Sequence, residues 1–567
     1  MKFSEFTYER PDVTSLKTEF EEAVQVFKDA SSADEQNEAM KKVVALRNSF
    51  ESKARLAKIR HTINTEDVFY KEEQAFMDEN LPVYQGMVTA FHEALVQSPF
   101  KDELERKWGS QLFRLAELKV KTYSEDVLED LKQENKLSSE YVKVMASAKI
   151  EFDGRELNLA QLSPYVQSAD RETRKAASKA ANAFLSSNEE KFDSIYDELV
   201  QLRTGIAKKL GYSTFTELAY DRMGRTDYNA ADVKVFREQV KDIIVPLCTK
   251  LKKRQQKRIG LHEFKFYDEH FSFTTGNPKP QGDAEWIVNQ SKQVFSGLSQ
   301  ETGAFFNYMA EDELMDLESK SGKAPGGYCT YLQDYTAPFI FTNFNGSDND
   351  VRVLLHEIGH AFQMYTSRVF EVPEYQFPTL EACEIHSMSM EFLTYPWMDK
   401  LFGKDTEKYL YSHLTGAVEF IPYGVAVDEF QHFVYDNPDA TPSERRSKWR
   451  ELEKTYLPHR DYDGLEYLEN GGFWHRQGHI FRSPFYYIDY TLAQICALQF
   501  WKRAGEDSER AWEDYFALCQ KGGSLPFTKL VEEAGLISPF EKGCVASVVG
   551  EVEKFIATVD EEQFAKA

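Results

Sequence analysis

The chain has 567 residues, of which 42% are hydrophobic and 14% aromatic, a composition that excludes a disordered protein and supports sizeable cores. Its net charge of −25 disfavours nucleic acid and anionic membrane surfaces as partners. Residues 1–8 lack the apolar core of a signal peptide, and no run of about 18 apolar residues occurs that could span a membrane. The six cysteines lack CxxC spacing, so we expect free thiols and a cytoplasmic protein.

The first 200 residues predict long amphipathic helices. Apolar residues recur at three- and four-residue spacing over 16–28, 34–60 and 67–95, with little Pro or Gly. The run Asn80-Leu81-Pro82 predicts a break within the third stretch, which favours packed helical hairpins over a coiled coil.

Two later segments predict strands. Aromatic residues and Thr are frequent in 264–273 and 328–344, and loops rich in Gly, Pro and Lys lie at 274–282 and 319–327. The second strand segment ends shortly before the next predicted helix. We therefore expect a mainly helical protein with a small β-sheet beside that helix.

That helix carries an HExxH sequence, with Asp350 as its candidate N-cap. His356 and His360 are four residues apart, so both imidazoles can reach one ion from the same helix face. Glu357 can hold a water on that ion without ligating it, which is the pattern of catalytic zinc. Gly359 lowers helix propensity, which suggests that another element packs close there. The alternative is a helix that carries two histidines by chance.

The next predicted helix, 381–392, offers candidates for a third ligand, since catalytic zinc usually takes three protein ligands and a water. The candidates are Glu381, Glu384 and His386. His386 lies about 200° around the helix from Glu384, so it cannot serve the same site. Glu381 and Glu384 are one turn apart and share a face, and spacing alone does not choose between them.

A tyrosine-rich segment at 475–490 is the second chemical candidate. Peptide hydrolysis needs hydrogen-bond donors at the developing oxyanion, and tyrosine O–H and histidine N–H groups can supply them. Tyr487 and Tyr490 share a helical face and follow His479. Two alternatives stay open: a packed aromatic core, and a second metal pair formed by His475 and His479, which the glycine between them disfavours.

Several stretches carry a family resemblance. HEIGHAFQ and EACEIHSMSMEF resemble the zinc site of the thimet oligopeptidase and oligoendopeptidase F family of metallopeptidases, and the pattern is most similar to the shorter oligoendopeptidase F branch, which includes Pz-peptidases. Further similar stretches lie at 207–212, 215–220, 244–247, 325–329, 339–344, 522–524 and 534–536. Residues before about 195 match only loosely, so we predict an N-terminal helical domain over 1–195 and a catalytic zinc-peptidase domain over 196–567.

The resemblance implies a metal site. Glu384 matches the third zinc ligand of the family, beside His356 and His360, and the implied cofactor is one Zn²⁺ per chain. Glu381 would then orient a ligand histidine through its other ring nitrogen, or be an ordinary solvated glutamate.

The resemblance also implies a catalytic role for the tyrosine-rich segment. His479, Tyr487 and Tyr490 match catalytic donors that approach the scissile carbonyl, and a one-residue gap leaves open whether Tyr487 or its neighbours Phe485 and Tyr486 hold the equivalent place. The related peptidases form two helical lobes around a deep substrate channel, with a thermolysin-like HExxH core. The resemblance therefore implies a mainly α, two-lobed fold.

The function that these expectations describe is a zinc-dependent endopeptidase for short unstructured peptides, collagen-derived peptides included. Glu357 acts as general base toward the activated water. Gly326, Gly327 and Tyr328 form either a strand edge that binds an extended peptide or a simple turn. The expected partners are peptides, neither nucleic acid nor membrane, and the expected state is a monomer.

Two other functions stay open. One is a noncatalytic helical scaffold that binds peptides, which would have no need of the base Glu357. The other is a zinc hydrolase that acts on an amide other than a peptide bond. Cleavage of unmodified peptides, blocked by a chelator, would separate both from the peptidase.

Overall fold

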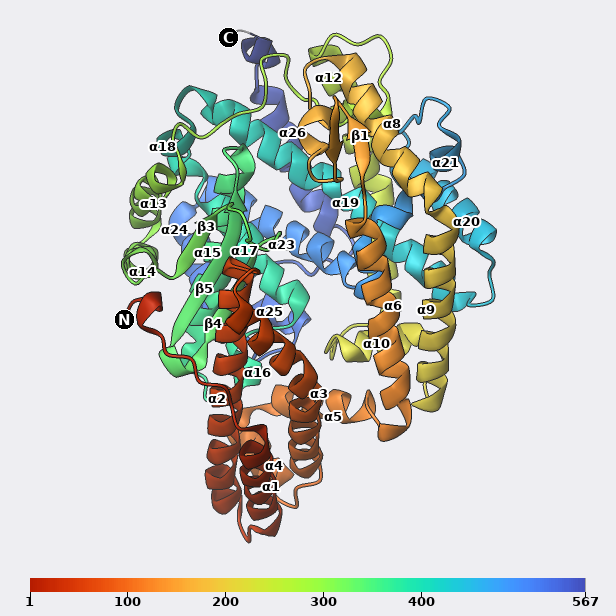
Figure 1. Cartoon of the computed structure of the whole chain (residues 1–567). Coiled ribbons are helices and arrows are strands. Elements are labelled where there is room, and N and C mark those ends of the chain that lie inside the picture. Colours follow the sequence, from red (N-terminus) through yellow and green to blue (C-terminus); the bar gives the residue numbers. More distant parts are fainter. Residues whose placement is uncertain (566–567) are drawn as a thin grey trace.

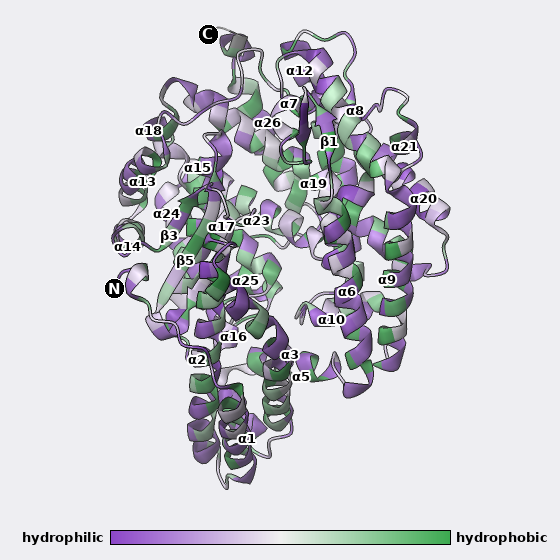
Figure 2. Cartoon of the chain, in the orientation of Figure 1, coloured by the Kyte–Doolittle hydropathy of each residue, from purple (hydrophilic) through white to green (hydrophobic). Residues whose placement is uncertain are grey.

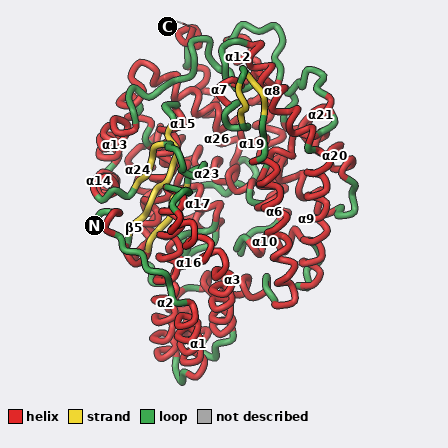
Figure 3. The backbone as a smooth tube through the Cα atoms, viewed as in Figure 1, coloured by secondary structure: helices red, strands yellow, loops and turns green. Residues whose placement is uncertain are grey.

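The computed structural model describes residues 1–565, and most of them are helical (Figure 1; Figure 3). The N-terminal helices form the lower part of Figure 1, and the first of them is capped by Asp12, whose carboxylate accepts hydrogen bonds from the N–H groups of Thr14 and Ser15. This part contains α1 (Val13–Asp29), α2 (Ala33–Ile63), α3 (Val68–Val96), α4 (Lys101–Trp108) and α5 (Ser110–Lys121). α6 (Leu128–Ala146) and the hairpin of β1 (Ile150–Phe152) and β2 (Arg155–Leu157) follow in the chain and lie higher in the view, with β1 next to α8.

The three helices predicted near the N-terminus are confirmed as α1, α2 and α3. The break predicted at Pro82 is wrong, because α3 continues through this residue. Leu81, Pro82 and Val83 are exposed, so the backbone carbonyl that loses its N–H partner at the proline can bond to water.

A second group of helices follows the β1–β2 hairpin. Its members are α7 (Ser163–Val166), α8 (Arg171–Ser187), α9 (Glu189–Lys209), α10 (Phe215–Arg222), α11 (Ala230–Gln239), α12 (Val245–Arg258), α13 (Ala284–Leu298) and α14 (Gln300–Glu311). The strand predicted at 264–273 is wrong, because this segment is irregular apart from one 3-10 turn. Gln255 of α12 donates hydrogen bonds to the carbonyls of Glu269 and Phe271, so a side chain takes the place of a strand partner.

A three-stranded sheet precedes the HExxH helix, as predicted. Its order is β3–β5–β4, with β3 (Met315–Glu318) parallel to β5 (Ala337–Phe344) and β4 (Tyr328–Leu332) antiparallel to it. β4 and β5 lie within the segment predicted as strand, whereas the sequence pattern missed β3. α15 (Asp348–Thr366) carries the motif and packs against β5 and β4 (Figure 1).

The C-terminal part contains the most deeply buried helices. α17 (Leu380–Leu393) is buried from Glu381 to Leu393 and packs between α15 and α23 (Tyr487–Glu506). Figure 2 shows hydrophilic and hydrophobic residues alternating along outer helices such as α9, as expected for helices that bury one face. The other helices are α16 (Pro373–Gln376), α18 (Asp399–Phe402), α19 (Thr406–Asp436), α20 (Pro442–Tyr456), α21 (Glu466–Glu469), α22 (Gly478–Arg482), α24 (Ser508–Lys521), α25 (Phe527–Glu533) and α26 (Cys544–Thr558).

The segment that joins α15 to α17 packs against the N-terminal helices. Val372 and Tyr375 belong to an apolar cluster with residues of α1 to α5. Glu374, between them, forms an ion pair with Arg47 at 2.8 Å and a hydrogen bond with His92 at 3.1 Å. The N-terminal helices therefore hold the connection between the two helices that carry the candidate metal ligands.

Among the described residues, no helix is both long and apolar enough to cross a membrane. The six cysteines are free thiols, as predicted. The predicted domain boundary at residue 195 falls within α9 and stays a prediction.

Candidate metal centre

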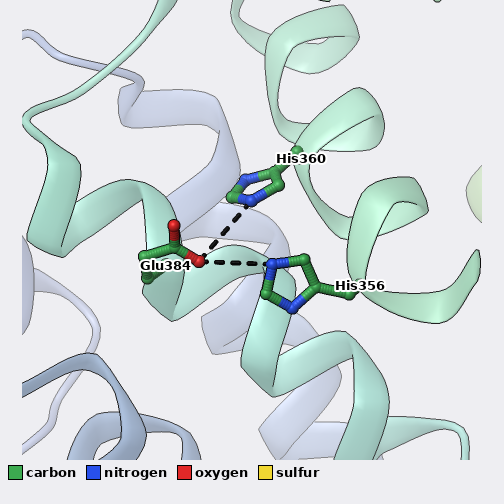
Figure 4. A group of neighbouring side chains, drawn as sticks. All are labelled: His356, His360 and Glu384. Carbon is green, nitrogen blue, oxygen red and sulfur yellow. Dashed lines mark ion pairs between the residues drawn. The ribbon is translucent and has the colours of Figure 1, made fainter. Parts of the chain in front are cut away.

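His356 and His360 lie one turn apart on α15 and point toward Glu384 of α17 (Figure 4). Glu384 Oε2 is 3.3 Å from His356 Nε2 and 3.6 Å from His360 Nε2. One ligand atom of each of the three residues lies within 4.8 Å of the other two. Of the two glutamates that spacing left open, the structure brings Glu384 to the histidines.

The two helices approach closely because α15 has a glycine where they cross. A Cβ atom on Gly359 would lie 2.7 Å from the backbone oxygen of His386 and 2.7 Å from Cα of Ser387. No side chain fits there unless α17 moves. The expectation that another element packs close at Gly359 is confirmed, and this contact sets the distance between Glu384 and the histidines.

The N-terminal end of α15 differs from the prediction. The helix begins at Asp348, so the N-cap predicted at Asp350 is wrong. The Asp350 carboxylate instead accepts hydrogen bonds from the backbone N–H groups of Asn345 and Gly346. Asp350 therefore fixes the turn that joins β5 to α15.

The geometry of the three side chains fits a tetrahedral cation. Zinc holds nitrogen and oxygen ligands at about 2.0–2.1 Å, so ligand atoms at tetrahedral angles lie roughly 3.3–3.4 Å apart. The two distances from Glu384 Oε2 are close to this separation. Burial would raise the pKa of Glu384, but the charges and hydrogen bonds of His360 and His356 hold it well below its usual value. The carboxylate is thus in the ionised form that binds a cation.

Glu391, two turns beyond Glu384 on α17, orients one of the histidines. Its Oε1 lies 2.7 Å from His356 Nδ1, and its Oε2 lies 2.6 Å from Nε2 of His413 on α19. The contact with Nδ1 leaves His356 Nε2 free to bind an ion. Burial would raise the pKa of Glu391, but the hydrogen bonds with His356 and His413 bring it to about 2. Sequence reasoning missed Glu391, although its seven-residue spacing from Glu384 places both on one helix face.

The orienting role predicted for Glu381 is wrong. Glu381 is 1% exposed, and its Oε1 accepts a hydrogen bond from Tyr228 at 3.1 Å rather than from a ligand histidine. The second ring nitrogen of His360 lies 4.0 Å from Sγ of Cys383. A thiol therefore occupies the place next to His360 where a carboxylate was expected.

Glu357 borders a cavity beside the metal centre. The cavity has a volume of about 460 Å³ and is lined by residues of the first turns of α15, the end of β5 and the glycines before β4. Glu357 Oε2 is buried and has no hydrogen-bond partner among the described residues. Burial raises the pKa of Glu357, which makes its carboxylate a stronger base than an exposed one.

The predicted peptide-binding residues divide into two groups. Gly326 and Gly327 line the cavity, and a Cβ atom on Gly327 would lie 3.9 Å from Glu357 Oε1. Gly326 has a φ of 96°, so it forms a turn that only glycine adopts readily, and β4 begins at Tyr328. The hydroxyl of Tyr328 lies 2.6 Å from Thr62 Oγ1 on α2, so this side chain packs against the N-terminal helices.

The tyrosine-rich segment places a cluster of aromatic rings next to Glu384. The hydroxyl of Tyr486 donates to Glu384 Oε1 at 3.2 Å. The ring centroid of His479 lies 4.8 Å from that of Tyr487 and 5.9 Å from that of Tyr490. Burial lowers the pKa of His479 to about 4 and raises the pKa of Tyr490 to about 12, so both are neutral donors at pH 7. The structure thus brings His479, Tyr487 and Tyr490 together, and of the alternatives Phe485, Tyr486 and Tyr487 it is Tyr486 whose hydroxyl reaches Glu384.

His475 does not belong to this cluster. Its side chain is fully buried, with Nε2 3.1 Å from Asp193 and Nδ1 2.9 Å from the hydroxyl of Tyr467. These partners satisfy both ring nitrogens. The alternative of a second metal pair formed by His475 and His479 is therefore wrong.

Comparisons with known proteins point to one family. The sequence model of the peptidase M3 N-terminal domain matches residues 3–123, and that of peptidase family M3 matches residues 165–549. A solved structure of Pz peptidase A with an inhibitor is similar at 60% identity and a TM-score of 0.93, covering 99% of this chain and 100% of that chain. Oligoendopeptidase F from Enterococcus faecium shares the fold, with a TM-score of 0.65 at 15% identity over 97% of this chain and 98% of that chain. Oligopeptidase PepF of Bacillus subtilis (strain 168) is 22% identical over 407 residues, which cover 67% of this chain and 57% of PepF. The chain belongs to peptidase family M3.

Proposed function

We propose that the chain is a zinc-dependent metalloendopeptidase that hydrolyses internal bonds of short, unstructured oligopeptides. The observation that carries this proposal is the position of Glu384 Oε2, 3.3 Å and 3.6 Å from the two histidine nitrogens. Beside them lies the proposed base Glu357, whose Oε2 has no hydrogen-bond partner in the described part of the chain. The similarity to Pz peptidase A and to oligopeptidase PepF supports peptides as the substrate class.

His356, His360 and Glu384 would hold the ion, one per chain. When bound there, zinc supplies Lewis acidity toward water and the peptide carbonyl. Glu357 accepts a proton from the attacking water at its carboxylate and then delivers it to the leaving amine. Its raised pKa assists the first transfer, because a buried carboxylate with few hydrogen bonds gains more from protonation.

The tyrosine-rich segment would stabilise the negative charge that develops on the carbonyl oxygen. Tyr490 and Tyr487 are the proposed donors, with His479 as a further donor. All three are neutral and largely shielded from water, where a hydrogen bond to a charged oxygen is strongest. Tyr486 is not proposed as an oxyanion donor, because its hydroxyl already donates a hydrogen bond to the carboxylate of Glu384.

The outer edge of β4, at Cys329, would pair with the peptide backbone. β4 bonds to β5 on one side only. Arg55 of α2 donates to the carbonyl of Tyr331 at 2.6 Å, so this carbonyl faces away from β5. Because backbone groups of alternate residues in a strand point the same way, the N–H and C=O groups of Cys329 also point away from β5, toward the outer edge. That edge leads to Gly326 and Gly327 beside the catalytic base.

Three finer expectations from the sequence remain part of the proposal. They are cleavage of collagen-derived peptides, a monomeric state and a cytoplasmic location. Free cysteines support the last of these.

Mass spectrometry of a peptide-library digest tests the proposal. We expect cleavage inside peptides of several residues, its loss with a chelator, and its loss in Glu357→Gln with zinc still bound. Stoichiometric zinc without cleavage of any peptide would favour the noncatalytic scaffold. Cleavage confined to amides other than peptide bonds would favour the other class of zinc hydrolase.

A further inference from the structure

The junction between α22 and α23 contains a residue in an unfavourable backbone conformation. Phe485 has a φ of 65°, in the left-handed region that non-glycine residues rarely adopt. Its side chain is fully buried. Such a conformation persists only where the surrounding structure holds it, and it is often found where a functional group must be aimed.

Two buried side chains from distant elements hold both backbone groups of Phe485. Gln431 of α19 accepts a hydrogen bond from the Phe485 N–H at 2.9 Å. Arg225, in the loop after α10, donates from Nη2 to the Phe485 carbonyl at 2.7 Å. The same Nη2 donates to Asp489 in the first turn of α23 at 2.6 Å, so Arg225 also joins the junction to the helix that follows. Gln431 is 1% exposed and Arg225 is 4% exposed.

The turn at Phe485 determines where the next tyrosines point. Tyr486 follows directly, and its hydroxyl reaches Glu384. Tyr486 and Tyr490 are four residues apart, and their ring centroids lie 4.8 Å apart. A change in the direction in which α23 begins would therefore move both rings relative to the metal ligand.

We propose that Gln431 and Arg225 are positioning residues of the peptidase. They impose the left-handed turn at Phe485 and so aim Tyr486 at Glu384 and Tyr490 at the substrate carbonyl. This inference rests on the proposed peptidase function. Within the described part of the chain, neither side chain has a hydrogen bond to His356, His360 or Glu384, so each acts on catalysis through the tyrosines.

The variant Gln431→Met tests the inference, because methionine has a similar volume but offers no acceptor to the Phe485 N–H. We expect kcat to fall about 10-fold to 100-fold, as for a small misplacement of catalytic groups, with KM and zinc content nearly unchanged. Gln431→Glu keeps an acceptor oxygen and should retain most of kcat. An equal loss in both variants would overturn the inference.

Gln499→Met is the matched control. Like Gln431, Gln499 is a buried glutamine whose side chain bonds to the backbone of a distant residue. It accepts from the Ile537 N–H at 2.8 Å and donates to the Ile537 carbonyl at 2.9 Å. Its loss should lower the melting temperature about as much as Gln431→Met does, but should leave kcat unchanged. A fall in kcat that simply follows melting temperature across both variants would show a merely structural role.

A combined variant separates positioning from an independent effect. If Gln431 acts through Tyr486 and Tyr490, adding Gln431→Met to a variant that already carries Tyr486→Phe and Tyr490→Phe should slow catalysis no further. Losses that multiply would contradict the inference. Should Gln431→Met not fold, Arg225→Lys replaces it, because the lysine side chain is one atom shorter and its nitrogen cannot reach the position of Nη2, which serves both Phe485 and Asp489.

A crystal structure of Gln431→Met supplies a readout that does not depend on activity. We expect the φ of Phe485 to leave the left-handed region and the Tyr486 hydroxyl to leave Glu384. An unchanged junction would overturn the inference even if no peptide were cleaved. Failure of the wild-type chain to cleave any peptide, with the junction altered in the variant, would instead refute the proposed function.

Discussion

The substitution Glu391→Gln should weaken zinc binding without unfolding the protein. Glutamine keeps the size of the side chain but removes the charge that pairs with His356 Nδ1 at 2.7 Å and His413 Nε2 at 2.6 Å. Glu391 is only 7% exposed, so water does not replace the lost interaction. Loss of such a partner of a ligand histidine typically lowers metal affinity about 10-fold to 100-fold, which corresponds to about 1.4–2.7 kcal/mol.

The assay is competition for zinc against a chromophoric chelator at constant pH, with the melting temperature of the metal-free protein recorded beside it. Glu381→Gln is the control, because Glu381 lies on the same helix but bonds to Tyr228. Its zinc affinity should equal that of the wild type. The reasoning would be refuted if Glu391→Gln bound zinc as tightly as the wild type, or if Glu381→Gln weakened binding as much.

Three further predictions concern the oxyanion, the helix crossing and acid stability. Tyr490→Phe should lower kcat about 10²–10³-fold with little change in KM, as steady-state kinetics will show; an equal rise in KM would argue against the oxyanion role. Gly359→Ala should lower the melting temperature and weaken zinc binding, because the added Cβ meets the backbone of α17. Gly416→Ala is the control and should change neither, because nothing lies within 4 Å of a Cβ added there. Burial would raise the pKa of Glu269, but Arg460 lowers it from 4.5 to about 2. The ion pair therefore stabilises the fold by about 3 kcal/mol above pH 4.5, and this contribution disappears as the pH falls toward 2. Glu269→Gln should therefore melt at a lower temperature than the wild type at pH 7, with a smaller difference at pH 3; a constant difference would contradict the assignment.

The candidate metal centre was predictable where it depends on local helical geometry. His356, Glu357 and His360 lie within two turns of one helix, so their relative positions follow from the helical repeat. Glu384 required the family resemblance, because Glu381 satisfies the same spacing on the same face. What separates the two glutamates is where α17 crosses α15 at Gly359, and this is a property of tertiary packing.

Features that depend on contacts between distant segments were missed or wrong. Glu391 acts across two helices, and β3 exists because it pairs with β5. The segment 264–273 has the composition of a strand, but the carbonyls of Glu269 and Phe271 accept hydrogen bonds from the Gln255 side chain instead of from a strand partner. The placement of Tyr486 at the ligand carboxylate depends on the backbone turn before it, which composition does not reveal.

The anchoring of the 370–379 segment has a consequence for attempts to shorten or transplant this peptidase. A fragment that began at residue 196 would expose Val372 and Tyr375 to water and leave the carboxylate of Glu374 without Arg47, a loss of the order of 3–5 kcal/mol for a buried pair. The displaced segment is the connection between α15 and α17, the two helices that carry the proposed zinc ligands. Protein engineers who want a minimal enzyme must therefore retain α1 to α5, even though these helices contribute none of the proposed zinc ligands.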